Sequence, residues 1–394
     1  MTPLGPAHPR RPLPGPAQAA ILWTATRLAL IGYVLLASFL LNLPLGGRER
    51  GADDFVLARF TWWDSFHFLR IADWGYLPPG VPCCDQAFFP GYPMAIRALA
   101  PLTGGNLALA GWLVSLVAAT AAAVALWRLG ELATGSAAGG RAAVLFLAVA
   151  PYGFFLSAVY SEALFLAFAV GAWWAGTTRR WWLAGLLAGC ATGVRINGVF
   201  LAGGLAVMYL LQLRADRRAG GSGLPRPDAL ALAAPLLAIG AYVWHLHALT
   251  GSWNAWLEAQ AKGWDRRTAW PWQGLAAGWT SALDAASPDL VISRWADVVV
   301  AVYGIALVVV LLVLRRWAEA VYVAPNVAVL VCSTTLVSGP RYAVMWFPAY
   351  LLLAAFVTRR AGGVGAWVTW AVVLAGVPLL AVVSLSFAAH LWTA

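Results

Sequence analysis

"WWLAGLLAGCATGVRINGVFLAGGLAVMYLLQL", residues 181–213, is an apolar run with arginines at both ends. Arg179 and Arg180 precede it, and Arg214 follows it. Basic clusters that flank membrane-spanning segments lie on the cytoplasmic side, so this run must cross a membrane an even number of times. About thirty residues suffice for two short helices, and "GVRING" (193–198) provides a break between them. We therefore predict a helical hairpin whose tip lies on the outer side.

The composition extends this prediction to the whole chain. Of its 394 residues, 61% are hydrophobic and 11% are charged, and the mean hydropathy is +0.74. Many apolar runs are long enough to cross a bilayer core of roughly 30 Å. The net charge of +10 comes from arginines clustered between these runs. This pattern orients helices, so we expect an all-α, polytopic transmembrane bundle with membrane lipids, and no nucleic acid, as partners.

The basic clusters predict the topology. Apolar spans lie at residues 19–43, 106–128, 142–157, 161–177, 181–213, 228–249, 293–314, 317–337, 341–358 and 364–390. Placing the arginine clusters in the cytoplasm gives about 11 transmembrane helices and two large outer loops, 44–105 and 250–292. The proline-rich residues 1–18 are expected to be a disordered cytoplasmic tail. Residues 19–394 are expected to form one integral-membrane domain.

The first outer loop contains "RFTWWDSFHFLRIADWGY" (59–76), which is rich in charge for this chain. A helix over 60–76 places Asp64 and His67 on one face and Trp62 and Phe66 on another. We predict an interfacial helix whose aromatic face rests among headgroups, with Asp64 as general base. An anchor helix with incidental charges is the alternative. Asp-x-x-His also suits a metal, but without a convincing third ligand we predict none.

Other polar residues are predicted at outer helix ends. Glu162 starts a span, either as a helix N-terminal residue or as a second carboxylate facing a cavity. Arg195 and Asn197 lie at the hairpin tip, and Arg341 follows "SGP". Arginines at this depth are suited to holding a phosphate or pyrophosphate, or they snorkel to the interface.

Three further features have less specific patterns. "AFFPGYP" (87–93) contains two prolines and a glycine, so we expect an interfacial turn or a loop instead of regular helix. Cys83 and Cys84 are adjacent, so free thiols or an unremarkable loop are expected. The second outer loop carries six tryptophans, as an aromatic belt or a sugar-stacking surface: Trp253, Trp256, Trp264, Trp270, Trp272 and Trp279. The sequence shows no P-loop, dinucleotide fingerprint or nucleophile elbow.

The first block, with the following "AFFPGYPMAIRAL", resembles the signature of the PIG-V family, the second mannosyltransferase of GPI-anchor synthesis, and its bacterial relatives. Further similar blocks are "PYGFFLSAVYSEALFLAF" (151–168), "LAGCATGVRINGVFLAG" (187–203) and "PRYAVMWFPAY" (340–350). The sequence departs from many relatives at two positions. Ser65 stands where Gly or Ala is common, and Gly91 stands where many relatives have the Leu of a Pro-Leu-Tyr-Pro pattern.

This family belongs to the GT-C glycosyltransferases. The resemblance implies an enzyme that takes a hexose, usually mannose, from a polyprenyl-phosphate sugar on the extracytoplasmic side, with Asp64 matching the family's loop aspartate. We expect His67 to orient Asp64 or contact the donor phosphate, Arg70 to help bind substrate, and no cofactor or metal to be needed. The acceptor is expected to be a glycolipid or envelope glycan.

Arginine far outnumbers lysine and alanine is abundant, which suggests a high-GC bacterial genome and a plasma-membrane location. Two other functions are compatible with such a chain. One is a lipid or sugar transporter or flippase, which should have ionisable groups near the midplane and repeated halves. The other is a non-catalytic scaffold subunit of an envelope complex.

Overall fold

The computed structural model describes residues 15–44, 54–77, 80, 83–221, 224–360 and 362–393. These residues form sixteen α-helices and five 3₁₀-helices without a named β-strand. The predicted all-α class is confirmed. Residues 1–14 of the predicted N-terminal tail lie outside the described residues. The first helix begins at Gly15, before the predicted start at residue 19.

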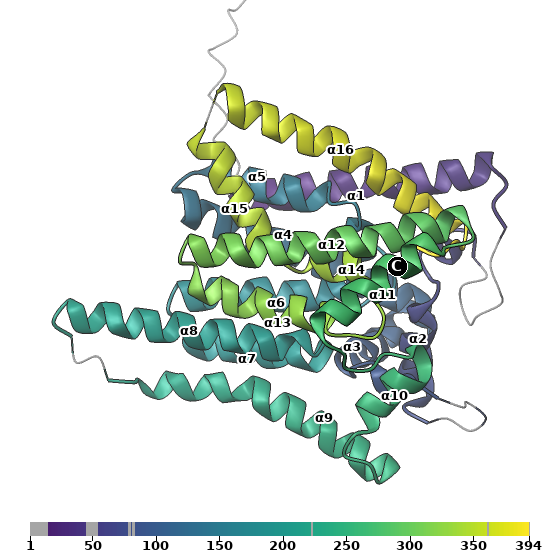
Figure 1. The fold of residues 1–394 in the computed structure, drawn as a ribbon, viewed down its shortest axis with the longest axis horizontal. Helices are drawn as coiled ribbons and strands as arrows, with labels where there is room; N and C mark the ends of the chain where they lie inside the picture. Colours follow the sequence, from purple (N-terminus) through teal and green to yellow (C-terminus); the bar gives the residue numbers. More distant parts are fainter. Residues whose placement is uncertain are drawn as a thin grey trace, which may run out of the picture.

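Eleven apolar helices form the bundle (Figure 1). Six contain segments long and apolar enough to cross a membrane: α1 (Gly15–Leu40), α4 (Leu107–Thr134), α8 (Asn197–Arg218), α9 (Ala234–Thr250, extended by the 3₁₀-helix Pro227–Ala233), α12 (Pro288–Val313) and α16 (Gly363–Ala388). Five are shorter: α5 (Ala137–Ala148), α6 (Glu162–Thr177), α7 (Trp181–Val194), α13 (Trp317–Val331) and α15 (Pro348–Arg359). They correspond in order to the predicted crossings, and residues 181–213 form the predicted hairpin. The chain is a polytopic membrane protein.

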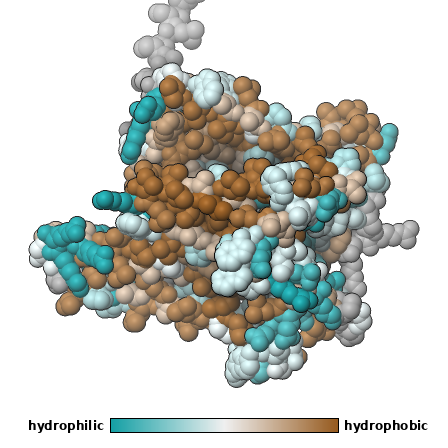
Figure 2. Space-filling view, viewed as in Figure 1, coloured by the Kyte–Doolittle hydropathy of each residue, from teal (hydrophilic) through white to brown (hydrophobic). Residues whose placement is uncertain are grey.

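The two ends of the bundle differ in character. The axes of most helices lie roughly parallel. One end of the bundle contains the end of α8 at the left of the view, and the other contains α2, α3, α10 and α11 (Figure 1). Arg179 pairs with Asp216 of α8 at 2.8 Å, near Arg214, Arg217 and Arg218. We call this the basic end. Figure 2 shows hydrophilic residues there and over α10, and an apolar surface across α12 and α16.

Small residues let the central helices approach closely. α4 packs against α1, α5 and α6, and its buried residues include Ala118, Ala119, Ala122 and Ala123. A Cβ added at Gly130 of α4 would lie 2.6 Å from the carbonyl oxygen of Gly139 in α5. Membrane helices lack a strong hydrophobic force between them, so such close van der Waals contact contributes much of their association.

The predicted span 142–157 is not one continuous helix. α5 ends at Ala148, and a 3₁₀-helix covers Gly153–Leu156. Pro151 explains the break, because it donates no hydrogen bond and disfavours helical geometry in the residue before it. The buried Arg27 of α1 donates to the carbonyls of Ala148 and Gly153, the latter at 3.1 Å. These bonds satisfy backbone groups that the break leaves without helical partners.

The first outer loop contains the predicted helix in shorter form, α2 (Asp64–Trp74). Trp63 before it has a positive φ of 56°, which is rare for a bulky residue. The Tyr160 hydroxyl holds this turn, since it donates to the Trp62 carbonyl at 3.1 Å and accepts from the Asp64 amide at 3.3 Å. The aromatic face predicted to rest among headgroups packs partly on protein, because Trp62 stacks on His390 with ring centroids 4.0 Å apart.

Residues 87–93 do not form only a turn. α3 (Gly91–Leu99) begins within them, so the expectation that the prolines prevent regular helix is wrong from Gly91 onward. Pro93 lies in the first turn of α3, where a missing amide donor breaks no intrahelical bond. A Cβ at Gly91 would lie 2.7 Å from the Gly193 carbonyl oxygen, so α3 closely approaches the end of α7.

The second outer loop contains α10 (Ala255–Trp264) and α11 (Pro271–Leu283). α13 ends at Val331, before the predicted limit of its span, and Thr268 pairs with Ser333 in an isolated β-bridge. The predicted span 341–358 is two helices, α14 (Gly339–Val344) and α15, because Pro348 starts a new helix after a short turn. These breaks place several helix ends beside α2 and α10.

Candidate active site

A cavity of about 150 Å³ lies where α2, α8, α10 and α14 meet. Its lining combines ionisable, amide and aromatic side chains, including Asp64, Arg195, Asn197, Gln260, Arg266, Asn326, Arg341 and Tyr342. The helices that supply them are far apart in sequence. The end of the bundle opposite the basic end therefore contains a polar site built from several helix ends.

Asp64 and Arg341 form the central ion pair. Asp64 is the first residue of α2, and its Oδ2 lies 2.8 Å from Nη2 of Arg341 in α14. The Arg341 guanidinium also lies over the ring of Tyr160, with its Cζ 4.7 Å from the centroid. Arg341 is only 6% exposed, so both the carboxylate and the aromatic ring contribute to holding this cation.

Glu162 lies behind this pair. It is 0% exposed, and its Oε1 accepts from Nη2 of Arg341 at 2.9 Å. The same oxygen lies 3.1 Å from Nη1 of Arg195, which also donates to the Ser161 hydroxyl at 2.7 Å. Glu162 is both the first residue of α6 and a buried carboxylate beside the cavity. One carboxylate therefore positions two guanidinium groups from different helix ends.

The hairpin break contributes an amide as well as a cation. Arg195 lies between α7 and α8, and Asn197 starts α8. Asn197 donates to the Asn326 side chain of α13 at 2.5 Å, and Asn326 in turn donates to the Tyr322 carbonyl at 2.6 Å. These bonds join α8 to α13 at the cavity wall.

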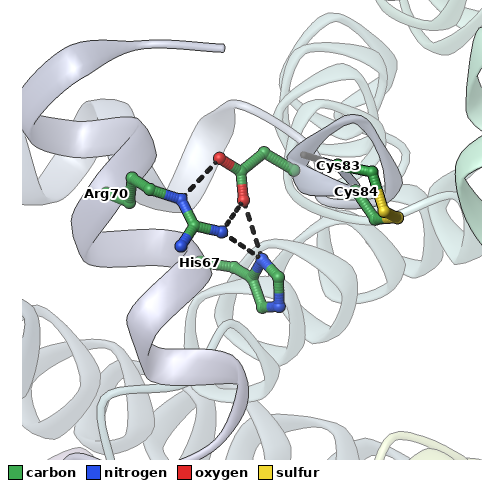
Figure 3. The surroundings of a disulfide bond; sticks show 5 residues. His67, Arg70, Cys83 and Cys84 are labelled. Carbon is green, nitrogen blue, oxygen red and sulfur yellow. Dashed lines mark hydrogen bonds and ion pairs between the residues drawn. A yellow bond between two sulfur atoms is a disulfide. The ribbon is translucent and has the colours of Figure 1, made fainter. Parts of the chain in front are cut away.

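His67 and Arg70 belong to a neighbouring cluster and do not line this cavity. His67 Nδ1 lies 2.7 Å from Asp85, and Arg70 Nε donates to the other Asp85 oxygen at 2.8 Å. Figure 3 shows His67 and Arg70 side by side, next to Cys83 and Cys84. Although burial acts to raise it, the hydrogen bonds from Arg70 and His67 hold the pKa of Asp85 below its usual value.

Of the two roles expected for His67, orienting Asp64 does not match this arrangement, whereas contact with the donor phosphate stays a prediction, as does substrate binding by Arg70. Residues 64 and 67 are neighbours on one helix face, but Asp85 provides a buried carboxylate for His67 that helical spacing could not reveal. The expectation of free thiols is also wrong, since Cys83 and Cys84 form a disulfide. Their side chains lie on the same side of the turn, and Cys84 is buried against Gly263 of α10.

Aromatic side chains form much of the cavity wall. Trp63, Trp256, Trp264 and Trp392 line it, and Trp63 packs edge-on against Trp392 with centroids 4.9 Å apart. The predicted tryptophan set in the second outer loop therefore divides: Trp256 and Trp264 face the cavity, whereas Trp253, Trp270, Trp272 and Trp279 are more than half exposed. Aromatic faces of this kind suit a ligand with apolar ring surfaces.

Some of these residues had no distinguishing sequence signal. Trp392 lies near the chain end, Asp85 sits in a loop, and Arg266 is one of several charges around α10. Within the ranges that the structure describes, no group of three or more His, Cys, Asp or Glu side chains is arranged to hold a metal ion.

The fold and site define an all-α integral membrane protein with a charged, aromatic-lined cavity at one end of its bundle. Residues 51–214, which include Asp64, Glu162, Arg195 and Asn197, match the family model described as mannosyltransferase (PIG-V). This region of the chain is therefore similar to that family.

Curated proteins with mannosyltransferase names are similar to part of the chain. The chain is similar to GPI alpha-1,6-mannosyltransferase 2 of Mus musculus, with 34% identity over 210 residues, which are 48% of this chain and 42% of the relative. For the Homo sapiens protein of the same name, identity is 38% over 158 residues, covering 38% and 31% of the two chains. For GPI mannosyltransferase 2 of Chaetomium globosum, the identity is 30% over 246 residues, which are 53% of this chain and 50% of the relative. The chain thus spans half or less of the length of these relatives.

Proposed function

We propose that the chain is a membrane mannosyltransferase that moves a hexose from a polyprenyl-phosphate sugar to a glycolipid or glycan acceptor. The observation that carries this proposal is the joining of Asp64, Arg341, Glu162 and Arg195 at one aromatic-lined cavity. The match of residues 51–214 to a mannosyltransferase family model supports mannose as the transferred sugar, and similar curated proteins are also named mannosyltransferases. In this proposal the cavity faces the extracytoplasmic side of a bacterial plasma membrane; the arginine cluster at the basic end, opposite the cavity, supports that orientation.

The reaction is a displacement at the anomeric carbon. An acceptor hydroxyl oxygen forms the new bond to C1, and the bond from C1 to the phosphate oxygen breaks with its electron pair. Asp64 takes the hydroxyl proton as general base. The lipid phosphate is already a leaving group, so the proposal requires no nucleotide. Attack opposite the leaving oxygen inverts C1, so a β-linked donor gives an α-linked product.

Arg341 and Arg195 are proposed to stabilise the departing phosphate. Negative charge grows on its oxygens as the C1–O bond breaks, and guanidinium groups offer planar pairs of donors for such oxygens. Glu162 keeps both cations within reach of the cavity before the donor arrives. Prior positioning lowers the reorganisation that the reaction requires.

The tryptophans around the cavity are proposed to contact the sugar and the first isoprene units of the donor. The polyprenyl chain would remain in the bilayer, because the cavity lies beside membrane-spanning helices. In a lipid or sugar transporter or flippase, the alternative function, the ionisable groups would be expected near the midplane. The gathering of Asp64, Arg195, Arg266 and Arg341 at one end of the bundle favours the transferase.

Reconstituted protein provides the test. Proteoliposomes are supplied with polyprenyl-phosphate mannose labelled in the sugar and with a lipid extract, and mass spectrometry identifies any mannosylated product. We expect label transfer by the wild type and by Asp73→Asn, which changes an exposed residue of the same helix, but not by Asp64→Asn. Movement of the intact donor across the bilayer without label transfer would support the transporter instead.

A further inference from the structure

Arg266 lines the cavity but differs from the other two arginines in its partners. It lies between α10 and α11, where Nη1 donates to the Tyr342 hydroxyl at 2.9 Å and Nη2 to the Val337 carbonyl at 2.7 Å. Neither partner is a carboxylate. Among the residues that the structure describes, no carboxylate lies within ion-pair distance of Arg266, and its Nε is buried without a hydrogen-bond partner.

The charges around the cavity do not balance. Arg195, Arg266 and Arg341 provide three positive charges, whereas Asp64 and Glu162 provide two negative ones. Arg294 and Asp297 of the neighbouring α12 do not line the cavity: Arg294 donates to the Leu336 carbonyl, and Asp297 accepts from the Gly339 amide. An uncompensated cation beside membrane-spanning helices is costly, because low-polarity surroundings solvate it poorly. The site is therefore one negative charge short when no ligand is bound.

Tyr342 links the unbalanced cation to the rest of the site. Two guanidinium groups lie near its ring, with Cζ of Arg195 at 5.5 Å and Cζ of Arg266 at 5.7 Å from the ring centroid. Arg341 is the preceding residue of α14. An anion placed near Tyr342 would thus be approached by arginines from the hairpin break, the second outer loop and α14.

We propose that Arg266 is a third phosphate-binding residue, which supplies the cation that balances the lipid phosphate. This inference rests on the proposed function. A sugar phosphodiester carries one negative charge, the number that the empty site lacks. Transfer moves the acceptor proton to Asp64, and the freed phosphate monoester holds the negative charge that Asp64 loses. The total charge of the site then stays the same from donor to product.

The monoester product should depend on Arg266 more than the donor does. Its charge at neutral pH is about −1.5 to −2, against −1 for the diester. Arg266→Gln should therefore weaken binding of a short-chain prenyl monophosphate by about tenfold to a hundredfold, the range for one charged hydrogen bond. Binding of the matching prenyl alcohol should not change, and Arg266→Lys should retain part of the phosphate binding.

Arg267→Gln is the matched control. Arg267 is adjacent, its side chain is 70% exposed, it pairs with Asp265 at 3.4 Å, and it does not line the cavity. Binding of both prenyl probes to purified protein is measured by calorimetry, and the thermal midpoint of each variant is recorded. We expect Arg267→Gln to match the wild type for both probes.

Each result has a defined meaning. Unchanged phosphate binding in Arg266→Gln overturns the inference. The inference is also overturned if Arg266→Gln loses alcohol and phosphate binding equally and has a lower thermal midpoint, and if Arg266→Lys recovers neither. Arg266 would then only stabilise the fold through its hydrogen bonds to Tyr342 and Val337. If phosphate binding depends on Arg266 but the wild type transfers no sugar, the anion site stands and the proposed function is wrong.

Discussion

Asp64→Asn should lower turnover strongly and at the same time tighten binding of the lipid phosphate. In the unliganded site Asp64 holds Arg341 at 2.8 Å. A donor phosphate that binds Arg341 must compete with this carboxylate. Asparagine keeps the shape of the side chain but removes its charge and its basicity, so it separates the two roles of Asp64. A residue that only bound substrate would show weaker binding after the same change.

The expected gain in phosphate affinity follows from the solvent exposure of the Asp64–Arg341 ion pair. The Arg341 side chain is 7% exposed and that of Asp64 is 21% exposed, so the interaction is only partly screened by water. A charged hydrogen bond of this kind is worth roughly 1.5–3 kcal/mol, of which the neutral amide retains about half. Released competition of about 0.7–1.5 kcal/mol corresponds to phosphate binding about 3-fold to 13-fold tighter. Loss of the base should lower turnover by roughly 10²-fold or more.

The assay combines calorimetric titration with a prenyl monophosphate and single-turnover transfer in proteoliposomes. Asp73→Asn serves as the control for a charge lost from the same helix. Weaker phosphate binding by a well-folded Asp64→Asn protein would refute the competition. Near-normal turnover of that variant would remove Asp64 from the role of base, whatever the binding result.

Three further predictions concern the charged groups around the site. Arg341→Lys should lower turnover and donor affinity, and Arg341→Ala should lower them further, because lysine keeps the charge without the planar pair of donors; unchanged turnover at saturating donor would make Arg341 a structural anchor. Glu162→Gln should lower the thermal midpoint and the turnover together, since loss of the buried countercharge costs about 3–5 kcal/mol; a thermal midpoint equal to that of the wild type would contradict this. Folding lowers the pKa of Asp85. Its ionised form therefore stabilises the protein above the ordinary carboxyl pKa of about 3.9, and this stability is lost as pH falls through the lower folded value. The thermal midpoint of Asp85→Asn should thus change less between pH 3 and 7 than that of the wild type, and parallel curves for the two proteins would argue against this role.

Helix order and the main break were predictable because they depend on local signals. Arginines on both sides of residues 181–213 require an even number of crossings, and α7 and α8 provide two. Errors arose where a proline acts within a few residues. Pro151 ends a span that hydropathy reads as continuous, whereas Pro93 is accommodated in the first turn of α3. Hydropathy averages over such positions and cannot separate these outcomes.

The sequence by itself determined which residues carry unusual charge for a membrane protein. Asp64, Glu162, Arg195 and Arg341 stand out because ionisable side chains are costly near a bilayer, and a local pattern is enough to detect them. It also determined the all-α class, since only helices satisfy every backbone group within an apolar chain segment of this length.

Tertiary structure alone decided which charges meet. Glu162 meets Arg195, 33 residues later in the chain, and Arg341, 179 residues later, only because the start of α6, the hairpin break and α14 lie together. His67 lies one helical turn from Asp64, yet it pairs with Asp85 from a separate loop. Ion pairs depend on distances of a few ångströms between side chains, and sequence spacing specifies such distances only within one helix.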